Sequence, residues 1–558
     1  MSDDKLILLR AHTEILRCPK GRRRRKAATT ASTNVSRNRK EPGEPRWPES
    51  ALVIDCETST DERQSLTFGF YRYCRADANG MYVCVAEGIF HADELRETDR
   101  EAMSILEHYV DTVEAQTPKD YRHRLRLLSR SEFMRQVFWR ATLNPQNGAS
   151  ALIVGFNLPF DLSRLAVECS KARPHSEGWS LVMPQDEDPK TGLLRSDPFR
   201  QRVKTKPIDS KAAFIRFAGV SMPSRKTGRR LIPYTRGRFL DLRMLGWALR
   251  NQSYSLESAC QAFGVPGKLN HEPTGQITME EIDYCRQDVR ATLDLLNAMR
   301  TEFDRHPIDL RPDKAYSPAS IAKAYLKEMG VVPPRQKFAL APKEMGVAMQ
   351  SYYRGRAECR IRQTSVPVVH TDFLSEYPTV DSLMGLWSFL MAESLRVEDA
   401  TDEVKRLLAN LKLDTTFDQD FWKSLSFLAL VHPAGNILPV CTAYNGKTSN
   451  IGINPLTSNE PIWYAGPDLV AAALLTDRPP QIIRAIRVVP EGKQAGLNVV
   501  NLRGMVEIDP LTDDFFKVLI EARARVKANQ NFAEEERNAL SYFLKILANA
   551  GSYGLLLR

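Results

Sequence analysis

The chain has 558 residues, of which 43% are hydrophobic, and at roughly 100 to 200 residues per domain it holds about three or four folded units. Charged residues make up 26%, and no run approaches the roughly 18 to 20 apolar residues of a membrane span, so the composition excludes a transmembrane protein. The nine cysteines are scattered singly without a C-x-x-C pair, which excludes a disulfide scaffold and a cysteine zinc site and indicates a reducing cytoplasm.

The formal charge of +10 is concentrated near the N-terminus. Residues 17–46 hold eleven basic and two acidic residues, a net charge of +9, so the remainder of the chain is close to neutral in sum. Because this stretch has few apolar residues, we expect a disordered basic tail over residues 1–48. Charge alone leaves two functions open for it, a solvated targeting-like arm and a phosphate-binding arm. It has no apolar core of a secretory signal, so we predict a cytoplasmic or nucleoid-associated protein.

Strand-like segments follow the tail. ALVIDCETS, LTFGFYRYC and MYVCVAEGIF predict a meander of three strands. A helix over 129–142, the strand ASALIVGF and a helix from near Asp161 come next, and this alternation is typical of an α/β layer fold. Residues 171–237 are rich in Lys, Arg, Pro and Gly and are interpreted as an inserted hairpin region. The strand RFLDL and helices around 245–263 and 279–299 complete this part of the chain.

A second region begins near Tyr316 with the helix SPASIAKAYLKEMG. The apolar run VPVVHTDF predicts a strand at 366–373, and residues 424–490 predict several strands and one helix. Residues 511–558 predict two helical segments joined by the polar turn ANQNFAEEE. No solenoid repeat is present in the sequence.

Acidic residues recur at three places in the first region. Asp55 and Glu57 are two apart on a strand and therefore share one face, Asp161 stands where a strand turns into a helix, and Tyr284 and Asp288 share one helical face. Taken singly, each segment has an ordinary structural interpretation: a solvated strand end, a helix cap and an exposed helix face. Their conjunction, D-x-E, N-x-x-F-D and Y-x-x-x-D in this order, favours metal-dependent chemistry.

These three segments resemble the three motifs of the proofreading 3′–5′ exonucleases of the DEDD family, tyrosine subtype, which have an RNase H-like fold. The resemblance covers about residues 49–300. It implies two Mg²⁺ or Mn²⁺ ions held by Asp55, Glu57, Asp161 and Asp288, with Tyr284 orienting the attacking water. The chemistry agrees, because phosphodiester hydrolysis needs a hydroxide at neutral pH and a stabilised leaving oxyanion, which two hard cations supply.

A second group of charged residues lies in the C-terminal half. Asp372 ends the apolar run before LSEYP, Arg523 and Lys527 are four apart on a predicted helix, and Lys545 is on the next helix. Three cations on an antiparallel helix pair can grip a triphosphate. The alternatives are a strand-terminating Asp and a solvated basic face whose aliphatic stems cover the core.

These segments resemble family B DNA polymerases, closest to the viral and organellar group that includes protein-primed enzymes. DFLSEYP is similar to motif A, which implies that Asp372 and the Phe373 carbonyl ligate metal and that Tyr377 excludes a ribose 2′-OH. The resemblance also implies nucleotide binding by Arg523, Lys527, Lys545, Asn549 and Tyr553. The D-T-D motif of the family, which carries the second palm carboxylate, is absent before the last residue, Arg558. We therefore expect an incomplete nucleotidyl transfer site in this chain.

The predicted fold class is α/β. An RNase H-like exonuclease domain at 49–310 is followed by a linker and partial α+β palm with an insertion at 311–510, and by helical fingers at 511–558.

The leading functional interpretation is a DNA-directed DNA polymerase of family B type with 3′–5′ proofreading and an incomplete nucleotidyl transfer half. The alternatives are a stand-alone exonuclease that uses the polymerase remnant as a DNA-binding platform, and a non-catalytic nucleic-acid-binding subunit. The expected partners are DNA, as primer-template or single-stranded 3′ end, dNTP, and a terminal protein or a second chain that supplies the missing palm and thumb. No membrane partner is expected.

Overall fold

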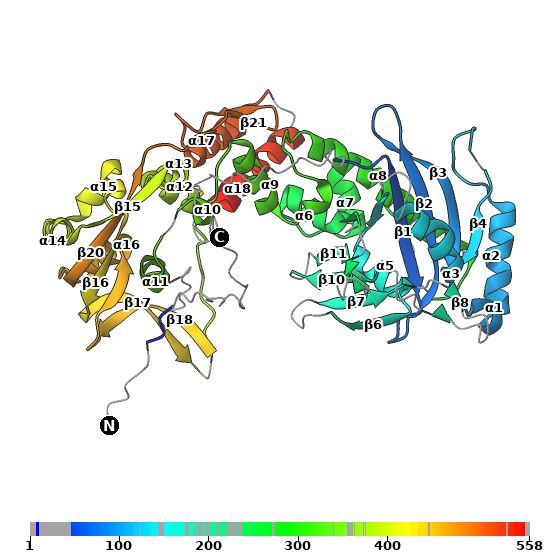
Figure 1. Ribbon diagram of the computed structural model, residues 1–558, viewed down its shortest axis with the longest axis horizontal. Coiled ribbons are helices and arrows are strands. Elements are labelled where there is room, and N and C mark those ends of the chain that lie inside the picture. The colour runs from blue at the N-terminus through cyan, green and yellow to red at the C-terminus, as the bar shows by residue number, and fades with distance from the viewer. Residues whose placement is uncertain are drawn as a thin grey trace, which may run out of the picture. The chain divides into compact units, whose positions relative to one another are not determined.

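The structure is a computed structural model, and the chain in it divides into two compact units (Figure 1). The N-terminal unit comprises Lys40–Tyr325 and Asn501–Val506, and the C-terminal unit comprises Met1–Arg39, Leu326–Val500 and Glu507–Arg558. The structure describes residues 7–10, 46–121, 123–142, 150–172, 178–183, 186–187, 194–195, 201–208, 213–218, 221–222, 230–231, 237–269, 274–338, 340–353, 361, 363–371, 373, 375–444, 447–531 and 534–552.

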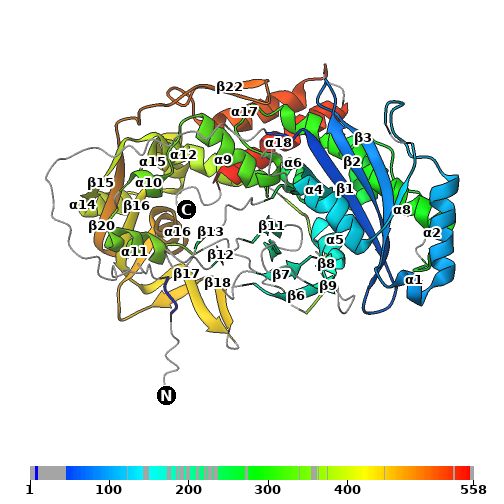
Figure 2. The same ribbon diagram turned by 45° about the vertical axis from the view of Figure 1, so that its right-hand side comes forward.

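A six-stranded mixed sheet forms the centre of the N-terminal unit, in the strand order β14-β5-β1-β2-β3-β4. Its strands are β1 (Ser50–Thr58), β2 (Leu66–Ala76), β3 (Tyr82–His91), β4 (Arg126–Ser129), β5 (Leu152–Gly155) and β14 (Phe239–Asp241). The first three strands form an antiparallel meander, which confirms the predicted one, and they lie side by side in both views (Figure 1 and Figure 2). β5 is parallel to β1, β14 is parallel to β5, and β4 is parallel to β3.

Helices cover the sheet. They are α1 (Leu95–Thr98), α2 (Arg100–Thr112), α3 (Arg130–Phe133), the π-helical η1 (Met134–Phe138), α4 (Trp139–Thr142), α5 (Leu158–Leu165), α6 (Leu242–Arg250), α7 (Leu256–Phe263), α8 (Met279–Asp304) and the 3-10 turn η2 (Pro312–Lys314). α8 packs across β1 and β2. The apolar residues of α5 belong to a buried cluster with Leu52 and Ile54 of β1. Because successive side chains of a strand point to opposite faces, Asp55 and Glu57 lie on the face away from Leu52 and Ile54.

The helical stretch predicted over 129–142 is present as α3, η1 and α4 in succession. A capping box at Ser129, whose side chain accepts from the Glu132 backbone amide, begins it. The helix predicted from near Asp161 begins earlier, at Leu158, so Asp161 is in its first turn and is not the cap. α1 and α2 were not predicted. The four-residue α1 shows the helical period weakly, but α2 has a capping Asp99 and apolar residues at helical spacing, so its signal was overlooked.

The basic insertion predicted at 171–237 contains strands, as expected. Its main element is a four-stranded antiparallel sheet in the order β11-β10-β7-β6. The strands of the insertion are β6 (Glu168–Lys171), β7 (Trp179–Val182), β8 (Asp186–Glu187), β9 (Leu194–Arg195), β10 (Val203–Pro207), β11 (Ala213–Phe217), β12 (Ser221–Met222) and β13 (Arg230–Leu231). Val203, Ile215 and Phe217 join the buried cluster of the large sheet, so one face of this small sheet is packed on the core.

The C-terminal unit contains an antiparallel sheet in the order β15-β20-β16-β19, with α14 and α16 packed on it. The strands after residue 390 are β15 (Ser394–Asp399), β16 (Phe427–His432), β17 (Ala434–Tyr444), β18 (Lys447–Thr457), β19 (Ile462–Ala465), β20 (Gln481–Glu491), β21 (Val500–Leu502) and β22 (Val506–Ile508). The helices after residue 317 are α9 (Pro318–Glu328), α10 (Pro334–Lys337), α11 (Pro342–Gln350), α12 (Glu376–Leu383), α13 (Trp387–Met391), α14 (Thr401–Ala409), η3 (Leu413–Phe417), α15 (Gln419–Lys423), α16 (Gly466–Thr476), α17 (Phe515–Ala528) and α18 (Glu534–Ser552). The two C-terminal helices match the two helical segments predicted from the sequence.

The strand predicted at 366–373 is wrong for the residues that the structure describes there. Residues 366–371 and Phe373 are in no strand, and Val368 and Val369 are 83% and 89% exposed. The alternating valines have β propensity, but a strand also needs a neighbouring backbone to hydrogen-bond. Within the described part of the chain no such neighbour pairs with this segment.

The described helices include none that combines the length and the apolar character needed to cross a bilayer.

Candidate functional site

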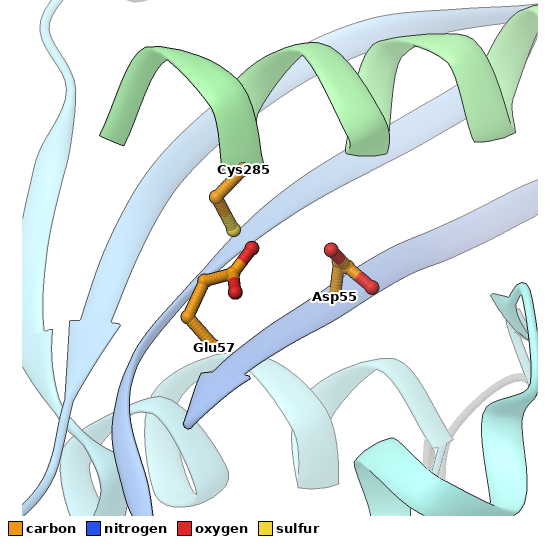
Figure 3. Close-up of side chains that lie close together, drawn as sticks. All are labelled: Asp55, Glu57 and Cys285. Atoms are coloured by element: carbon orange, nitrogen blue, oxygen red, sulfur yellow. The ribbon is translucent and has the colours of Figure 1, made fainter. Parts of the chain in front are cut away.

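The end of β1 presents two carboxylates from one face. Asp55 and Glu57 point toward α8, where the thiol of Cys285 faces them (Figure 3). One ligand atom from each of these three residues lies within 4.8 Å of the others, close enough to share one metal ion. The predicted shared face of Asp55 and Glu57 is therefore confirmed. Cys285 was not predicted here, because a lone cysteine between Tyr284 and Arg286 has no motif of its own.

The turn from β5 into α5 brings the third carboxylate to the same place. Asn157 adopts a left-handed backbone with φ 71°, and its backbone N–H donates to Asp241 Oδ1 at 3.0 Å. This turn sets the start of α5, so that Asp161 Oδ1 accepts from the backbone amide of Cys56 at 3.1 Å. Asp161 is thus tied directly to the strand segment between Asp55 and Glu57, and it is 2% exposed.

α8 carries the remaining predicted residues, Tyr284 and Asp288, and both side chains contact Lys268. Lys268 Nζ lies 2.7 Å from Asp288 Oδ2 and donates to the Tyr284 hydroxyl at 2.6 Å. Tyr284 and Asp288 are four residues apart, so they project from the same helical face, as predicted. The ammonium group therefore fixes the phenol and the carboxylate relative to each other.

Lys268 is the residue that the sequence did not reveal. It lies in the loop after α7, where its backbone amide donates to Glu257 Oε2 at 2.9 Å. Nothing in its sequence surroundings, PGKLNHEP, distinguishes it from a surface lysine. An indirect signal existed, because a buried acidic group attracts a cation, but the sequence alone does not say which one.

Burial and mutual repulsion act on the protonation of these acids. Burial, with the charges of Asp161, Glu57 and Asp288, raises the pKa of Asp55 well above its usual range. Burial is also the main cause that raises the pKa of Glu57 to about 7, followed by the charge of Asp288. The pKa of Asp161 is raised well above normal, again mainly by burial. These four carboxylates therefore form one electrostatic group, since ionising one opposes ionising the others.

Lys268 acts in the opposite direction on this group. Burial raises the pKa of Asp288, while the hydrogen bond and the charge of Lys268 lower it. Burial alone would lower the pKa of Lys268, but the hydrogen bond and charge of Asp288, with Tyr284, outweigh burial and raise it. The ion pair consequently keeps an ammonium beside the acidic group.

The donor set fits a hard divalent cation. Asp288 is 4% exposed, and its Oδ1 has no hydrogen-bond partner among the described residues. A buried carboxylate oxygen without a donor is costly unless a cation uses it. The charges of Asp161, Glu57 and Asp288 contribute to the raised pKa of Asp55, so the four carboxylates lie close enough to affect one another. Carboxylate oxygens are the ligands that Mg²⁺ and Mn²⁺ prefer.

The residues predicted for nucleotide binding are in the C-terminal unit. Arg523 Nη1 of α17 donates to Ser375 Oγ at 3.1 Å, which links α17 to the turn before Tyr377. The side chains of Tyr377 and Phe373 are 49% and 78% exposed. Lys527 and Lys545 are exposed and Asn549 is half-buried. α17 packs against both α12 and α18. Asp372 and Tyr553 lie outside the described residues.

Comparison with protein-family models and with curated proteins finds no match for this chain.

Proposed function

We propose that the N-terminal unit is a metal-dependent 3′–5′ exonuclease of the DEDD type. The observation that supports this most strongly is the convergence of Asp55, Glu57, Asp161, Tyr284 and Asp288 from β1, α5 and α8. Segments more than 100 residues apart along the chain meet here, as the hydrogen bond from Cys56 to Asp161 illustrates. A merely solvated strand end or helix cap would not bring these residues into one buried acidic group.

The topology of the large sheet also supports the proposal. An RNase H-like sheet has an antiparallel three-stranded meander, with two further strands added parallel to the first. Here β5 and then β14 extend the sheet from β1 on the side opposite β2. Asp55 and Glu57 lie in the C-terminal part of β1, and Asp161 follows the parallel strand β5, so the three carboxylates lie at the same edge of the sheet.

In this proposal Asp55, Glu57, Asp161 and Asp288 hold two Mg²⁺ or Mn²⁺ ions. When bound, these ions supply a hydroxide at neutral pH and stabilise the leaving oxyanion. Tyr284 offers its hydroxyl as the hydrogen-bonding group that orients the attacking water. Lys268 holds the Tyr284 phenol by its hydrogen bond, and its charge lowers the pKa of Asp288 against the effect of burial.

The test is digestion of a single-stranded DNA labelled at its 5′ end, with Mg²⁺ or Mn²⁺. The wild-type chain should shorten the strand from the 3′ end. Asp55→Ala/Glu57→Ala should abolish the activity, while Tyr284→Phe should reduce it less, since it leaves the carboxylates intact. The matched control is Glu94→Ala/Glu97→Ala, which removes two exposed carboxylates of the α1 region and should leave digestion unchanged. Persistent digestion by the Asp55/Glu57 variant, with circular dichroism unchanged, would contradict the proposal.

As a second function, we propose that the C-terminal unit binds the triphosphate of a dNTP, as in a family B polymerase. The observation that favours this is the hydrogen bond from Arg523 to Ser375, which brings a guanidinium to the turn that precedes Tyr377. Guanidinium groups bind phosphate oxygens in a bidentate manner.

Equilibrium binding of a fluorescent dATP tests this second function. Arg523→Ala should weaken binding about tenfold or more, since it removes a charge-assisted contact. Arg525→Ala removes an exposed guanidinium from the same helix and should have little effect. Equal binding by the wild-type and Arg523→Ala chains would leave the C-terminal unit without this role and favour the exonuclease alone.

A further inference from the structure

The basic insertion of the N-terminal unit carries a cavity that the acidic site does not use. Residues 171–237 contain 15 Lys and Arg against 6 Asp and Glu, a net charge of +9. The net charge outside the N-terminal tail is near zero, but this segment is a second strongly basic one. Within the described part of this block, β10 and β11 form an antiparallel pair in the small sheet (Figure 1).

The outer face of this pair is basic and aromatic. The register sets Lys204 opposite Arg216 and Lys206 opposite Phe214, while the alternate residues face the core. Cationic groups and a phenyl ring therefore share the face of the pair that points away from the core.

A cavity of about 300 Å³ opens on this face. Four cations and two aromatic rings line it, Lys204, Lys206, Arg216, Lys314, Phe214 and Tyr316, and no carboxylate does so among the described residues. The rings of Phe214 and Tyr316 meet edge to face with centroids 4.5 Å apart. Lys314 Nζ lies 5.9 Å from the centroid of the Tyr316 ring.

The buried carboxylate of Asp313 fixes one of these cations in place. Lys314 Nζ lies 3.3 Å from Asp313 Oδ2, and Arg311 and Arg238 contact the same carboxylate at 2.7 Å and 3.2 Å. This carboxylate therefore holds Lys314 beside Tyr316 at the edge of the cavity. Cationic side chains along a concave surface attract anions from solution.

We propose that this cavity, the β10–β11 groove, binds single-stranded DNA. Its cations would contact successive phosphates and its aromatic rings would stack on bases, which is how proteins hold a single strand without reading its sequence. Inorganic phosphate would need the cations alone, and duplex DNA would hide its bases from the rings. Several cations spread along one strand pair suit successive phosphates better than the single phosphate group of a mononucleotide. This proposal rests on the proposed exonuclease function, because the groove would be a second contact surface for the substrate of that activity.

The experiment measures binding of a fluorescent oligo(dT) by anisotropy in EDTA, so that no hydrolysis takes place. Lys204→Glu/Arg216→Glu should raise Kd tenfold or more and reduce the slope of log K against log[salt] by about 1.4, since two phosphate contacts are lost. Phe214→Ala should raise Kd roughly fivefold or more with the slope unchanged, because it removes stacking alone. Lys119→Glu/Arg135→Glu makes the same charge change at exposed positions elsewhere in the unit and should alter both values less.

Competition experiments decide between the sources of phosphate. Thymidine monophosphate at equal phosphate concentration should not displace the oligonucleotide, and its displacement of the probe would indicate a nucleotide pocket and overturn the proposal. An equal loss of duplex and single-strand affinity in Phe214→Ala would also overturn it. So would oligo(dT) binding that is unchanged in Lys204→Glu/Arg216→Glu.

A small substrate separates this proposal from the exonuclease assignment. The p-nitrophenyl ester of thymidine monophosphate offers one phosphodiester and is too short to occupy a second binding surface. Its hydrolysis should be lost in Asp55→Ala/Glu57→Ala and retained in Lys204→Glu/Arg216→Glu. If the wild-type chain does not hydrolyse it but binds oligo(dT) through the β10–β11 groove, the exonuclease assignment fails while the groove stands. Loss of this hydrolysis in the groove variant would show that the substitution damages the fold and overturn the separate role of the groove.

Discussion

Lys268 illustrates what a single residue contributes to the acidic group. Its ammonium is 2.7 Å from one carboxylate and 2.6 Å from a phenol, and it is the only cation for which an ion pair with the four site carboxylates is found in the described residues. Without it, Asp288 would share a buried volume with three other acids and no direct counter-charge. Such a group tends to take up protons, and a protonated carboxyl is a poor metal ligand.

We therefore expect Lys268→Ala to lower the exonuclease rate roughly 10- to 100-fold, the effect of losing a charged hydrogen-bond partner. The loss should shrink as pH rises, because hydroxide removes the protons that Asp288 retains in the variant. A pH profile of kcat with Mg²⁺ checks this, and Lys268→Arg, which keeps the charge, should recover part of the rate. A uniform loss across pH would assign Lys268 a purely structural role.

At this scale, the sequence predicted the acidic residues but not their partners. Asp55, Glu57, Asp161, Tyr284 and Asp288 stand at fixed spacings within strands and helices, where two- and four-residue intervals translate directly into a shared face. Lys268 and Cys285 reach the site through a loop and through the rotation of α8 about its axis. Neither is encoded by spacing, so only the folded chain reveals them.

Among the elements, the C-terminal end of α8 shows how a helix end is completed by distant groups. Arg46 donates to the carbonyl oxygens of Phe303, in the last turn, and of His306, just beyond it, in addition to the backbone bonds that these oxygens accept from His306 and Ile308. Beneath them His306 is 1% exposed, and its Nδ1 lies 2.8 Å from the Tyr325 hydroxyl. Burial, with the charges of Arg503, Arg46 and Arg305, lowers the pKa of His306 to about 3.

A pH dependence of stability follows from this shift. The unfolded chain takes up a proton on His306 below about pH 6.5, whereas the folded chain resists it until about pH 3, so the free energy of unfolding should fall as pH falls through this window. At pH 5 the loss amounts to about 2 kcal/mol. Measured by urea unfolding, the free energy of unfolding should depend less on pH for His306→Gln than for wild type. His108→Gln, at an exposed position of α2, should behave as wild type; equal slopes for His306→Gln and wild type would contradict the prediction.

The elements also show where the sequence misleads. The meander β1–β3 was predicted because alternating apolar residues and turn signals agree there. The segment 366–371 has a similar apolar pattern but no strand, because β structure depends on a partner backbone that the local sequence does not contain. α1 was missed for the opposite reason, since tertiary packing stabilises a four-residue helix whose own sequence signal is weak. The signals for α2, a capping Asp99 and apolar residues at helical spacing, are present in the sequence and were overlooked.

At the scale of the whole molecule, two segments carry +9 each by sequence, residues 17–46 and 171–237, and the rest of the chain carries −8, which leaves the net charge of +10. Basic contacts to phosphate release counterions and read no bases, so they add affinity without sequence preference. Under the proposed function, we therefore expect both basic segments to contribute to the affinity for DNA.

Deleting residues 1–46 should flatten the salt dependence of DNA binding, since thirteen basic residues are removed. The slope of log K against log[salt] measures this, with Kd rising at low salt and preference between sequences unchanged. Deletion combined with Lys204→Glu/Arg216→Glu should lower the slope further than either change alone. A slope unaffected by the deletion would show that the tail makes no phosphate contacts.

The central position of β1 has a consequence for how the chain folds. β1, β2 and β3 pair with near neighbours in sequence, so their closure costs little chain entropy and they can form early. β5 and β14 add in parallel to β1 only after long connections close, and the contact between Cys56 and Asp161 spans 105 residues. The acidic group is thus assembled last, by the slowest pairings of the sheet. A chain emerging from the ribosome would hold Asp55 and Glu57 on a formed hairpin well before Asp161 and Asp288 reach them. Under the proposed exonuclease function, it would not hydrolyse nucleic acid during that interval.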